Sequence, residues 1–557
     1  MTAKSNHNII KTQKATKYCF GRSNYLGLSL SIFATSKKYA MMFIRKGSVF
    51  ICLSLLSFLH IKAQNVSSAT IDPAPKREFR GVWVATVVNI DWPTSTHLTT
   101  EQQKSQLINL IEAHHETGIN AIMFQVRPAA DAFFGKSLEP WSQYLTGKQG
   151  KAPDPYYDPL ELAITEAHKR GMELHAWFNP YRATFGSNYA AVSPNHITRT
   201  HPEWFFIYGG QKLFNPGLPE VREYIVKVIL NVVDNYDIDG VHMDDYFYPY
   251  KIAGQAINDA EAFKQYGQGF SSISDWRRDN VNKLIKMLGD SIHKHKPYIK
   301  FGISPFGIWK NKAQDPEGSA TAGGDSYYEL YADGRKWIKE GWIDYINPQL
   351  YWPIGFRVAR FDTLAKWWSY NTYGRHLYIG QAAYRINERG NAAFKQPSQL
   401  PDQIRLIRAN PRIQGSVYFS SASLMHNPLG FTDSLKTNFY KYPALPPVML
   451  WLDSIAPNAP QLLTAVAGHN QVNLKWQTPT LAKDKEPVYG YVVYRFNEKD
   501  TINTSRPAHI LHIEYDNCTF YTDNTAQQGT KYIYVVTAID RLKNESEHSQ
   551  PVTVITR

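Results

Sequence analysis

Between Arg77 and about Tyr440, short apolar runs alternate with longer segments whose apolar positions recur at helical spacing. The short runs predict strands at Gly81–Val87, Ala121–Val126, Glu173–Phe178, Gly240–Met243, Lys300–Ser304, Ile343–Asn347, Leu377–Gly380 and Gly415–Phe419. The longer segments predict helices that include Glu101–Thr117, Asp158–Arg170, Val221–Tyr236, Trp276–His295, Tyr328–Glu340 and Phe361–Tyr373. This alternation predicts an α/β fold, a (β/α)8 TIM barrel with long loops after its strands. A doubly wound open sheet is the main alternative, but Asn89–Pro93 after the first strand is not a glycine-rich phosphate turn.

A different pattern follows the barrel. The proline-rich stretch Lys441–Pro447 begins a stiff linker, after which strands alternate with period two. These strands are expected at Gln471–Trp476, Tyr489–Phe496, Thr519–Asp523, Lys531–Asp540 and Pro551–Ile555. With Trp476 and a tyrosine-corner candidate at Tyr532, the segment resembles a fibronectin type III sandwich. The expected domains are a leader at 1–63, a barrel at 76–440, a linker at 441–458 and a sandwich at 459–557. The sandwich shows no catalytic set, and such a domain spaces, docks or binds glycan.

The positive charge of the chain is concentrated in its leader. The formal net charge is +13, but residues 1–63 contain ten Lys or Arg and no Asp or Glu, which leaves +3 for the rest. The charge therefore argues against nucleic acid as a partner. Basic residues from about Met41, an apolar run Val49–Leu59 and a small residue at Ala63 predict a secretory signal, with 1–40 as an over-extended start. A membrane-anchored N-terminus is the competing interpretation. Cys52 lacks a preceding small residue, so a lipid anchor is disfavoured, and we expect an exported, periplasmic or envelope-associated protein.

Cysteine use limits the chemistry that the mature chain can perform. Of three cysteines only Cys518 lies beyond the leader, so we expect neither a disulfide nor a Cys-based metal site. His242, Asp244 and Asp245 are a conceivable cation site, but the strand-1 His-x-His pattern of metal-dependent barrel hydrolases is missing. We expect His242 to be a buried, hydrogen-bonded barrel residue. No metal or cofactor is predicted.

The strand Gly240–Met243 ends in two adjacent carboxylates, Asp244 and Asp245, followed by aromatic residues. Active sites of barrel enzymes lie at the carboxyl ends of the strands. Alternation turns Val241 and Met243 toward the helices and Asp244 toward the barrel axis. The alternative is that both aspartates only cap the turn that follows.

Other strand ends add polar and aromatic groups to the same mouth. Alternation places Gln125 and Arg127 of the second strand, and Asn179 of the third, at the rim. Downstream of the sixth strand it adds Asn347, Gln349 and Tyr351. Aromatic residues that follow predicted strands are Trp92, Trp177, Tyr181, Tyr246, Trp309, Tyr351 and Trp352. Aromatic faces pack on sugar rings while amides, Arg and Asp bind hydroxyls, so the mixture favours a polysaccharide or oligosaccharide.

Five segments at strand ends resemble the glycosyl-hydrolase-like family 10 proteins. They are Arg80–Val84, Phe124–Pro128, His175–Arg182, Asp239–Pro249 and Asn347–Trp352, within a resemblance that covers roughly 76–435. It implies a secreted or lipid-anchored bacterial (β/α)8 barrel that hydrolyses glycosides, and one similar member cleaves peptidoglycan strands stripped of peptides. It also implies Asp244 and Asp245 as the catalytic positions, with Arg127, Asn179 and Tyr351 as neighbours. The missing lipid-attachment pattern departs from many members.

The catalytic mechanism stays open at the level of sequence. Asp244 is the expected principal carboxylate and Asp245 its partner or orienting group, because two close carboxylates raise one pKa. A second catalytic acid is sought on loops at Asp91, Asp131 or Asp325. A substrate 2-acetamido group is the minority alternative as nucleophile. Substrate contacts are expected from Asp91, Trp92, Arg127, Asn179, Tyr181, Tyr246, Asn347, Gln349, Tyr351 and Trp352. The alternative function is a non-catalytic carbohydrate-binding protein that uses the barrel cleft, and the oligomeric state is left open.

Overall fold

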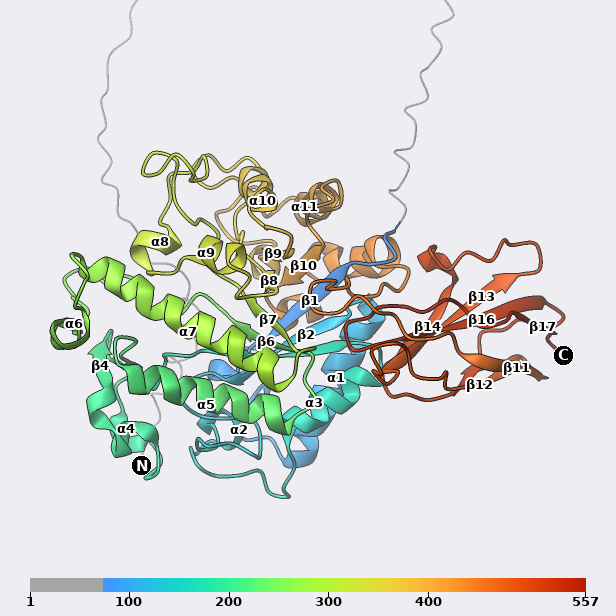
Figure 1. Ribbon diagram of the computed structural model, residues 1–557, viewed down its shortest axis with the longest axis horizontal. Coiled ribbons are helices and arrows are strands. Elements are labelled where there is room, and N and C mark those ends of the chain that lie inside the picture. The colour runs from blue at the N-terminus through green and yellow to red at the C-terminus, as the bar shows by residue number, and fades with distance from the viewer. Residues whose placement is uncertain (1–73) are drawn as a thin grey trace, which may run out of the picture. The chain divides into compact units, whose positions relative to one another are not determined.

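A computed structural model describes residues 74–557 of the chain (Figure 1). Eight parallel strands close into a barrel in sequence order, and the last, β10, pairs with β1. The strands are β1 (Phe79–Val84), β2 (Ala121–Arg127), β3 (Glu173–Phe178), β6 (Gly240–Met243), β7 (Lys300–Ile303), β8 (Tyr345–Ile346), β9 (His376–Gln381) and β10 (Gly415–Tyr418). All eight predicted strands are present, and the barrel fold is confirmed.

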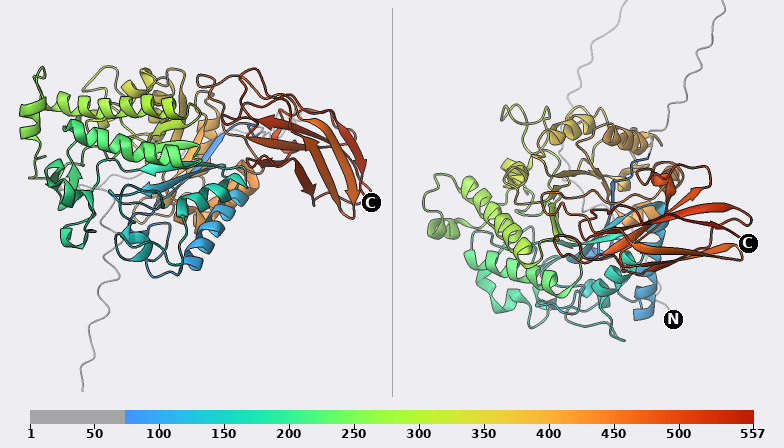
Figure 2. Two further views of the ribbon diagram at one scale, coloured as in Figure 1. Left: turned by 60° about the horizontal axis from the view of Figure 1, so that its bottom comes forward. Right: turned by 45° about the vertical axis from the view of Figure 1, so that its right-hand side comes forward.

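Helices surround the strands, as both views of Figure 2 show. The longer ones are α1 (Thr100–Thr117), α3 (Pro159–His168), α5 (Pro219–Asn235), α7 (Ile273–His295), α10 (Phe361–Ser369) and α11 (Gln399–Arg408). The shorter ones are α2 (Gln143–Thr146), α4 (Ile197–Thr200), α6 (Ala260–Tyr266), α8 (Ser326–Glu329), α9 (Gly334–Lys339), α12 (Ser421–Met425) and α13 (Phe431–Ser434). A hairpin of β4 (Phe205–Tyr208) and β5 (Gln211–Phe214) lies in the long loop between β3 and α5.

One predicted helix is wrong. The segment Tyr328–Glu340 is not continuous but divides into α8 and α9. Tyr331 between them has φ +54°, a left-handed conformation that interrupts helical hydrogen bonding. Asp333 then begins α9 by accepting a hydrogen bond from the Lys336 backbone N–H at 3.2 Å. Helical periodicity does not detect such a break, because the apolar residues keep their spacing across it.

The barrel has two separate apolar layers. Val241 and Met243 on β6 belong to the core between strands and helices, as do Leu174 and Phe178 on β3. Residues of the opposite parity, such as Trp83, Met123, Trp177 and Tyr345, fill the barrel interior. Side-chain directions on β3 and β6 therefore agree with the alternation read from the sequence, which directs the residue after Met243 toward the mouth.

The C-terminal domain is a sandwich of two antiparallel sheets, which confirms the predicted all-β fold. One sheet has the order β11 (Gln461–Gly468), β12 (Gln471–Gln477) and β15 (Phe520–Asp523). The other has the order β14 (Ile510–Glu514), β13 (Gly490–Asn497), β16 (Lys531–Ile539) and β17 (Val552–Ile555). Strands β11 and β14 are not among those predicted from the sequence. The hydroxyl of Tyr532 accepts a hydrogen bond from the upstream Gln527 N–H at 3.3 Å, as expected of a tyrosine corner.

The barrel and this domain belong to one compact unit, and a loop after β16 closes the amino end of the barrel. Leu542 packs in the interior cluster with Phe79 and Tyr345. Lys543 is fully buried, and its Nζ lies 3.4 Å from both Glu173 Oε1 and Asp239 Oδ1. The C-terminal domain therefore supplies part of the barrel floor.

The described helices include none with the length and apolar character that a membrane span requires. The predicted leader at 1–63 lies outside the described residues, so export stays a prediction.

Candidate active site

The tip of β6 is the chemical centre of the mouth. Asp244 and Asp245 follow the strand directly and are only 6% and 3% exposed. The Asp244 carboxylate also accepts a hydrogen bond from the Tyr246 backbone N–H at 3.3 Å, which is the turn-capping contact of the alternative interpretation. Capping accounts for this one contact and not for the side-chain partners that the carboxylates have in the segments after β3, β6 and β8.

On one side, Asp244 is connected to β3, β2 and β1. Asn179 Nδ2 donates to Asp244 Oδ2 at 2.5 Å, and Gln125 Nε2 donates to Asn179 Oδ1 at 2.6 Å. Gln125 Oε1 accepts from the backbone N–H groups of Thr86 and Val87, each at 2.9 Å. A line of buried amides therefore crosses four neighbouring strand ends and terminates at the carboxylate.

On the other side, Asp245 is connected to β8 and to the loop after β6. Gln349 Nε2 donates to Asp245 Oδ1 at 3.2 Å and to the Ser304 carbonyl at 3.0 Å. The Tyr250 hydroxyl donates to Asp245 Oδ2. The two consecutive carboxylates are thus held from opposite sides of the mouth, as expected for adjacent residues at the end of a strand.

The mouth favours protonated carboxyl groups. Burial, together with the neighbouring Asp245 carboxylate, raises the pKa of Asp244 to about 7 against the opposing influence of Arg182. Burial also raises the pKa of Asp245, against the hydrogen bonds from Tyr250 and Gln349. A carboxyl group with a pKa near neutrality can both hold and release a proton, which is the property required of a general acid.

Aromatic rings border the acids. Tyr246, Tyr250, Phe306 and Trp352 form a continuous series of edge contacts, with ring centroids 5.7, 6.3 and 5.5 Å apart. Tyr246 is 38% exposed and its ring lies against the Arg182 guanidinium, 4.6 Å from the centroid. Tyr351 and Trp352 are half-buried. This aromatic rim offers accessible ring faces next to hydrogen-bonding groups, which suits a saccharide.

Arg127, Tyr181 and Trp92, predicted to contact substrate, are buried in the protein. Arg127 makes two hydrogen bonds to Glu139 at 2.6 and 2.7 Å and donates to the Asn179 carbonyl at 2.7 Å. Trp92 is fully buried and donates to the Gln103 carbonyl at 3.0 Å. Tyr181 is 1% exposed, and its hydroxyl has no hydrogen-bond partner in the described chain. Their substrate contacts stay predictions, while the geometry shows Arg127 supporting the Asn179 segment.

Asn347 follows β8 and is fully buried, and neither atom of its amide has a hydrogen-bond partner within residues 74–557. The neighbouring Ser304 hydroxyl after β7 is likewise without one in the same residues. The predicted contact between Asn347 and a sugar stays a prediction.

Each of the three loop acids proposed as a second catalytic group accepts hydrogen bonds from backbone N–H groups. Asp91 accepts from the N–H groups of Ala85 and Ala422, both at 2.7 Å, which joins the ends of β1 and β10. Asp325 caps α8 by accepting from the Tyr328 N–H at 2.7 Å. Asp131 accepts from the Ala129 N–H at 3.2 Å, and burial raises its pKa to about 7. With these three engaged elsewhere, Asp245 is the carboxylate placed beside Asp244.

His242 is committed to the barrel interior. Trp83 Nε1 donates to its Nε2 at 3.0 Å, and its Nδ1 lies 3.0 Å from the Tyr345 hydroxyl. Both ring nitrogens are therefore occupied, which disfavours a cation site with Asp244. Among the described residues, groups whose ligand atoms come within 4.8 Å of one another occur in the linker and the C-terminal domain, at Glu514, Asp516 and Cys518 and at Asp453, Asp484 and Glu486.

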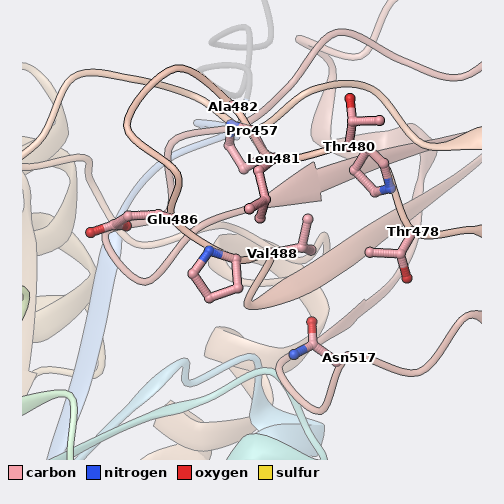
Figure 3. A pocket seen from close by; sticks show the side chains of 10 residues that line it. Pro457, Thr478, Thr480, Leu481, Ala482, Glu486, Val488 and Asn517 are labelled. Carbon is pink, nitrogen blue, oxygen red and sulfur yellow. The ribbon is translucent and has the colours of Figure 1, made fainter.

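A shallow pocket also lies in the C-terminal part, away from the barrel acids (Figure 3). Its lining is mainly proline, threonine and aliphatic residues, and Glu486 is the one ionisable residue among them. Its lining contains no second acid, and the carboxylates grouped with Glu486, Asp453 and Asp484, are not among the lining residues.

The two aspartates and their amide partners Asn179 and Gln349 were all among the residues predicted from the sequence. Arg182, Tyr250 and Phe306 had no predicted role. Arg182 lies within the family-like segment that follows β3, so its position was visible. Tyr250 and Phe306 lie in irregular loops, where the sequence carries no periodic signal.

Comparison with known proteins identifies the family of each domain. The model of the family described as glycosyl hydrolase-like 10 matches residues 78–397, and that of the fibronectin type III domain SaeA third domain matches 460–557. Glycosyl hydrolase YngK of Bacillus subtilis (strain 168) is 49% identical over 487 residues, 86% of this chain and 93% of that protein. Glycosyl hydrolase DigH of Escherichia coli (strain K12) is 36% identical over 412 residues, 68% of this chain and 92% of that protein.

Among solved structures, the glycoside hydrolase domain of PgaB (BpsB) from Bordetella bronchiseptica aligns with 65% of this chain and 98% of that chain, at 12% identity and a TM-score of 0.43. This structural similarity is too low to indicate a function. The family match and the two relatives show the family: the chain belongs to the glycosyl hydrolase-like 10 family, and its enzyme class is glycoside hydrolase.

Proposed function

We propose that this protein cleaves O-glycosidic bonds in a cell-wall-type polysaccharide, with peptide-free peptidoglycan glycan strands as the first substrate to test. The observation that carries the proposal is Asp244, a buried carboxyl group at the barrel mouth whose pKa is raised to about 7. A glycosidase needs such a group to protonate the leaving oxygen. The aromatic rim beside it supports a saccharide as the substrate.

In this mechanism Asp244 is the general acid. Its proton passes to the glycosidic oxygen as the bond to the anomeric carbon breaks, and Asp244 is left as a carboxylate. Water then adds to the anomeric carbon, and the proton that this water loses restores the carboxyl group of Asp244. Asp245, held by Gln349 and Tyr250, is the enzyme group positioned to support the positive charge that develops on the sugar. The engagement of Asp91 and Asp325 with backbone N–H groups supports Asp245, or a 2-acetamido group of the substrate, as the second participant.

We also propose that the protein is exported and acts in the periplasm or at the cell envelope. The support is the basic segment from Met41, the apolar run Val49–Leu59 and Ala63. Mass spectrometry of the N-terminus of the protein isolated from its natural host tests this. Cleavage after Ala63 is expected, and an intact N-terminus contradicts the proposal.

The substrate is tested by release of reducing ends from a panel of peptidoglycan, peptide-free glycan strands, chitin oligomers and plant glucans. Cleavage of the peptide-free strands is expected to be fastest. Asp244→Asn and Asp245→Asn are measured beside the natural protein, with Lys286→Met as a surface control because Lys286 is half exposed on α7. If the natural protein binds glycan but cleaves none of the panel, a non-catalytic binding function replaces the proposal. If cleavage survives both aspartate changes, the catalytic assignment is wrong.

A further inference from the structure

The amide line that reaches Asp244 has a fixed direction. Backbone N–H groups can only donate, so the atom of Gln125 that faces the Thr86 and Val87 N–H groups must be its oxygen. Gln125 Nε2 therefore points at Asn179 and must donate to an oxygen there. That leaves Asn179 Nδ2 to donate to Asp244 Oδ2. The two backbone N–H groups that follow β1 therefore determine the orientation of both side-chain amides.

This direction distinguishes the two oxygens of Asp244. Oδ2 accepts the 2.5 Å hydrogen bond from Asn179, whereas Oδ1 has the longer 3.3 Å contact with the Tyr246 N–H. A proton on Oδ2 would compete with the shorter bond. A proton on Oδ1 is compatible with both contacts.

We propose that Gln125 is a positioning residue for the hydrolytic reaction: through Asn179 it makes Oδ2 of Asp244 a hydrogen-bond acceptor and assigns the acid proton to Oδ1. The inference rests on the proposed function in that Asp244 is taken to be the acid. It adds a residue on β2 that does not contact substrate but decides which oxygen delivers the proton. Thr86, Gln125 and Asn179 are all at most 1% exposed, so water does not compete for these bonds.

Other charged and titratable groups face Asp244 and must stay constant in any test. They are Asp245 on the same strand end, Arg182 from the segment after β3 and Tyr250 from the loop after β6. The side chain of Gln125 is bonded instead to the end of β1 and to Asn179, so a change at Gln125 reaches Asp244 through Asn179.

Gln125→Glu is the informative variant because Glu has the same shape. One Glu oxygen still accepts from the Thr86 and Val87 N–H groups, and on the alkaline limb, where the Glu side chain is ionised, the other cannot donate to Asn179. The Asn179 amide then turns to donate to the introduced carboxylate, and its oxygen faces Asp244. Loss of a donor to the ionised form raises the pKa of Asp244. In the pH profile of kcat/KM, the alkaline limb is expected to move to higher pH by at least about one unit. This corresponds to a change of about tenfold in the acid dissociation constant of Asp244.

Gln381→Glu is the matched control. Gln381 is fully buried at the end of β9, and its Nε2 donates to Gln403 on α11 at 3.0 Å rather than to the amide line. It places a new buried carboxyl group at the end of a barrel strand, on the side that faces α11, without removing the donor to Asn179. Its alkaline limb is expected to move by less than half of the shift in Gln125→Glu.

The titration of Asp244 is followed in parallel by 13C NMR of protein labelled at the aspartate carboxyl carbons. The Asp244 signal is identified by its absence in Asp244→Asn. An unchanged titration in Gln125→Glu, an equal shift in Gln381→Glu, or a uniform loss of rate with an unmoved limb overturns the proposal. If the natural protein cleaves no glycan, the proposed function fails, while the NMR titration still decides whether Gln125 controls Asp244.

Discussion

The two ends of the barrel bury carboxylates in opposite ways. At the floor, Glu173 is 2.5 Å from Lys300 Nζ and 3.4 Å from Lys543 Nζ. At the mouth, Asp244 and Asp245 are held mainly by neutral donors, with Arg182 as the nearby cation. Both ends are shielded from water. The difference is that the floor pairs each carboxylate with a cation at close range, whereas the mouth places two carboxyl groups side by side with one nearby arginine.

This difference reverses the direction of the pKa shifts. At Glu173, burial favours the neutral form, but Lys300 and Lys543 outweigh it and hold the pKa below its ordinary value. His168 and Lys543 likewise outweigh burial and lower the pKa of Asp239. At Asp244, burial prevails and the pKa rises to about 7. Asp239 and Asp244 border the same strand β6, so pairing rather than depth decides which carboxyl group can act as an acid.

A chain of hydrogen-bonded side chains lies in the barrel interior between the two ends. Trp83 donates to His242 Nε2, so His242 Nδ1 carries the hydrogen and donates to the Tyr345 hydroxyl. Tyr345 in turn donates to His175 Nδ1 at 2.9 Å, and His175 Nε2 donates to Glu173 at 3.1 Å. Every member has a partner, so this line stabilises the barrel rather than supplying a free acid.

Removal of the acid at the mouth is expected to have the largest effect. Asp244→Asn keeps the shape of the side chain but cannot donate the carboxyl proton, so kcat/KM is expected to fall by about 10²- to 10⁴-fold. The protein should stay folded because Asn keeps the shape of the side chain and can still hydrogen-bond to Asn179. Steady-state cleavage of the best glycan of the panel measures the loss. A fall of less than about threefold would show that Asp244 is not the acid.

Removal of the cation at the floor is the counterpart. Lys543→Met leaves Glu173 and Asp239 with one fewer buried cation, and the free energy of unfolding is expected to fall by about 3 to 5 kcal/mol. Denaturant unfolding measures it. Lys286→Met is the control, because Lys286 pairs with Asp290 at the surface and should change stability by less than about 1 kcal/mol. Equal effects of the two changes would mean that the C-terminal domain is not part of the floor.

A change of pH should affect the stability contributions of the two barrel ends in opposite directions. The folded pKa of Asp244 lies above its ordinary value of 3.8, so its contribution to stability is full below about pH 4 and is lost as pH rises toward about 7. The folded pKa values of Glu173 and Asp239 are lowered, so their contribution is present above about pH 4 and is lost on acidification.

The difference in unfolding free energy between the natural protein and Asp244→Asn should therefore decrease between about pH 4 and 7, by at most about 4 kcal/mol. Unfolding curves at several pH values measure it. A difference that stays constant across this range would contradict the raised pKa of Asp244.

The smallest expected effect concerns Tyr250. Tyr250→Phe removes the hydroxyl that donates to Asp245 but keeps the ring contacts with Tyr246 and Phe306. The pKa of Asp245 should rise further, so the acid limb of kcat/KM should move upward by less than about one pH unit. The pH profile of cleavage measures this. Movement of the limb to lower pH would show that Asp245 does not act as a carboxylate.

Periodicity predicted the barrel strands well because each strand must bury alternate or consecutive apolar residues wherever it lies in the barrel. Strand β14 was not predicted, because its five residues are mostly half-buried and show no clear apolar alternation. The helix break at Tyr331 was not predicted either, because a left-handed residue does not change the spacing of apolar residues. At the site, the sequence indicated which residues follow the strands but not which of them are exposed. Trp92, Trp177 and Trp309 are buried, whereas Tyr246 is exposed to solvent.

By itself the sequence determined the fold class, the position of Asp244 and Asp245 at the tip of β6, and the family. These features depend on the local pattern of apolar and polar residues, which can be recognised within short segments of the sequence. Only the tertiary structure decided how the charges are paired. Lys543 reaches Asp239 across 304 residues of chain, and Gln125 reaches Asn179 across 54. Because hydrogen bonds and ion pairs act over a few ångströms of space, the folded chain alone decides which buried carboxyl group is neutralised by a lysine and which keeps its proton.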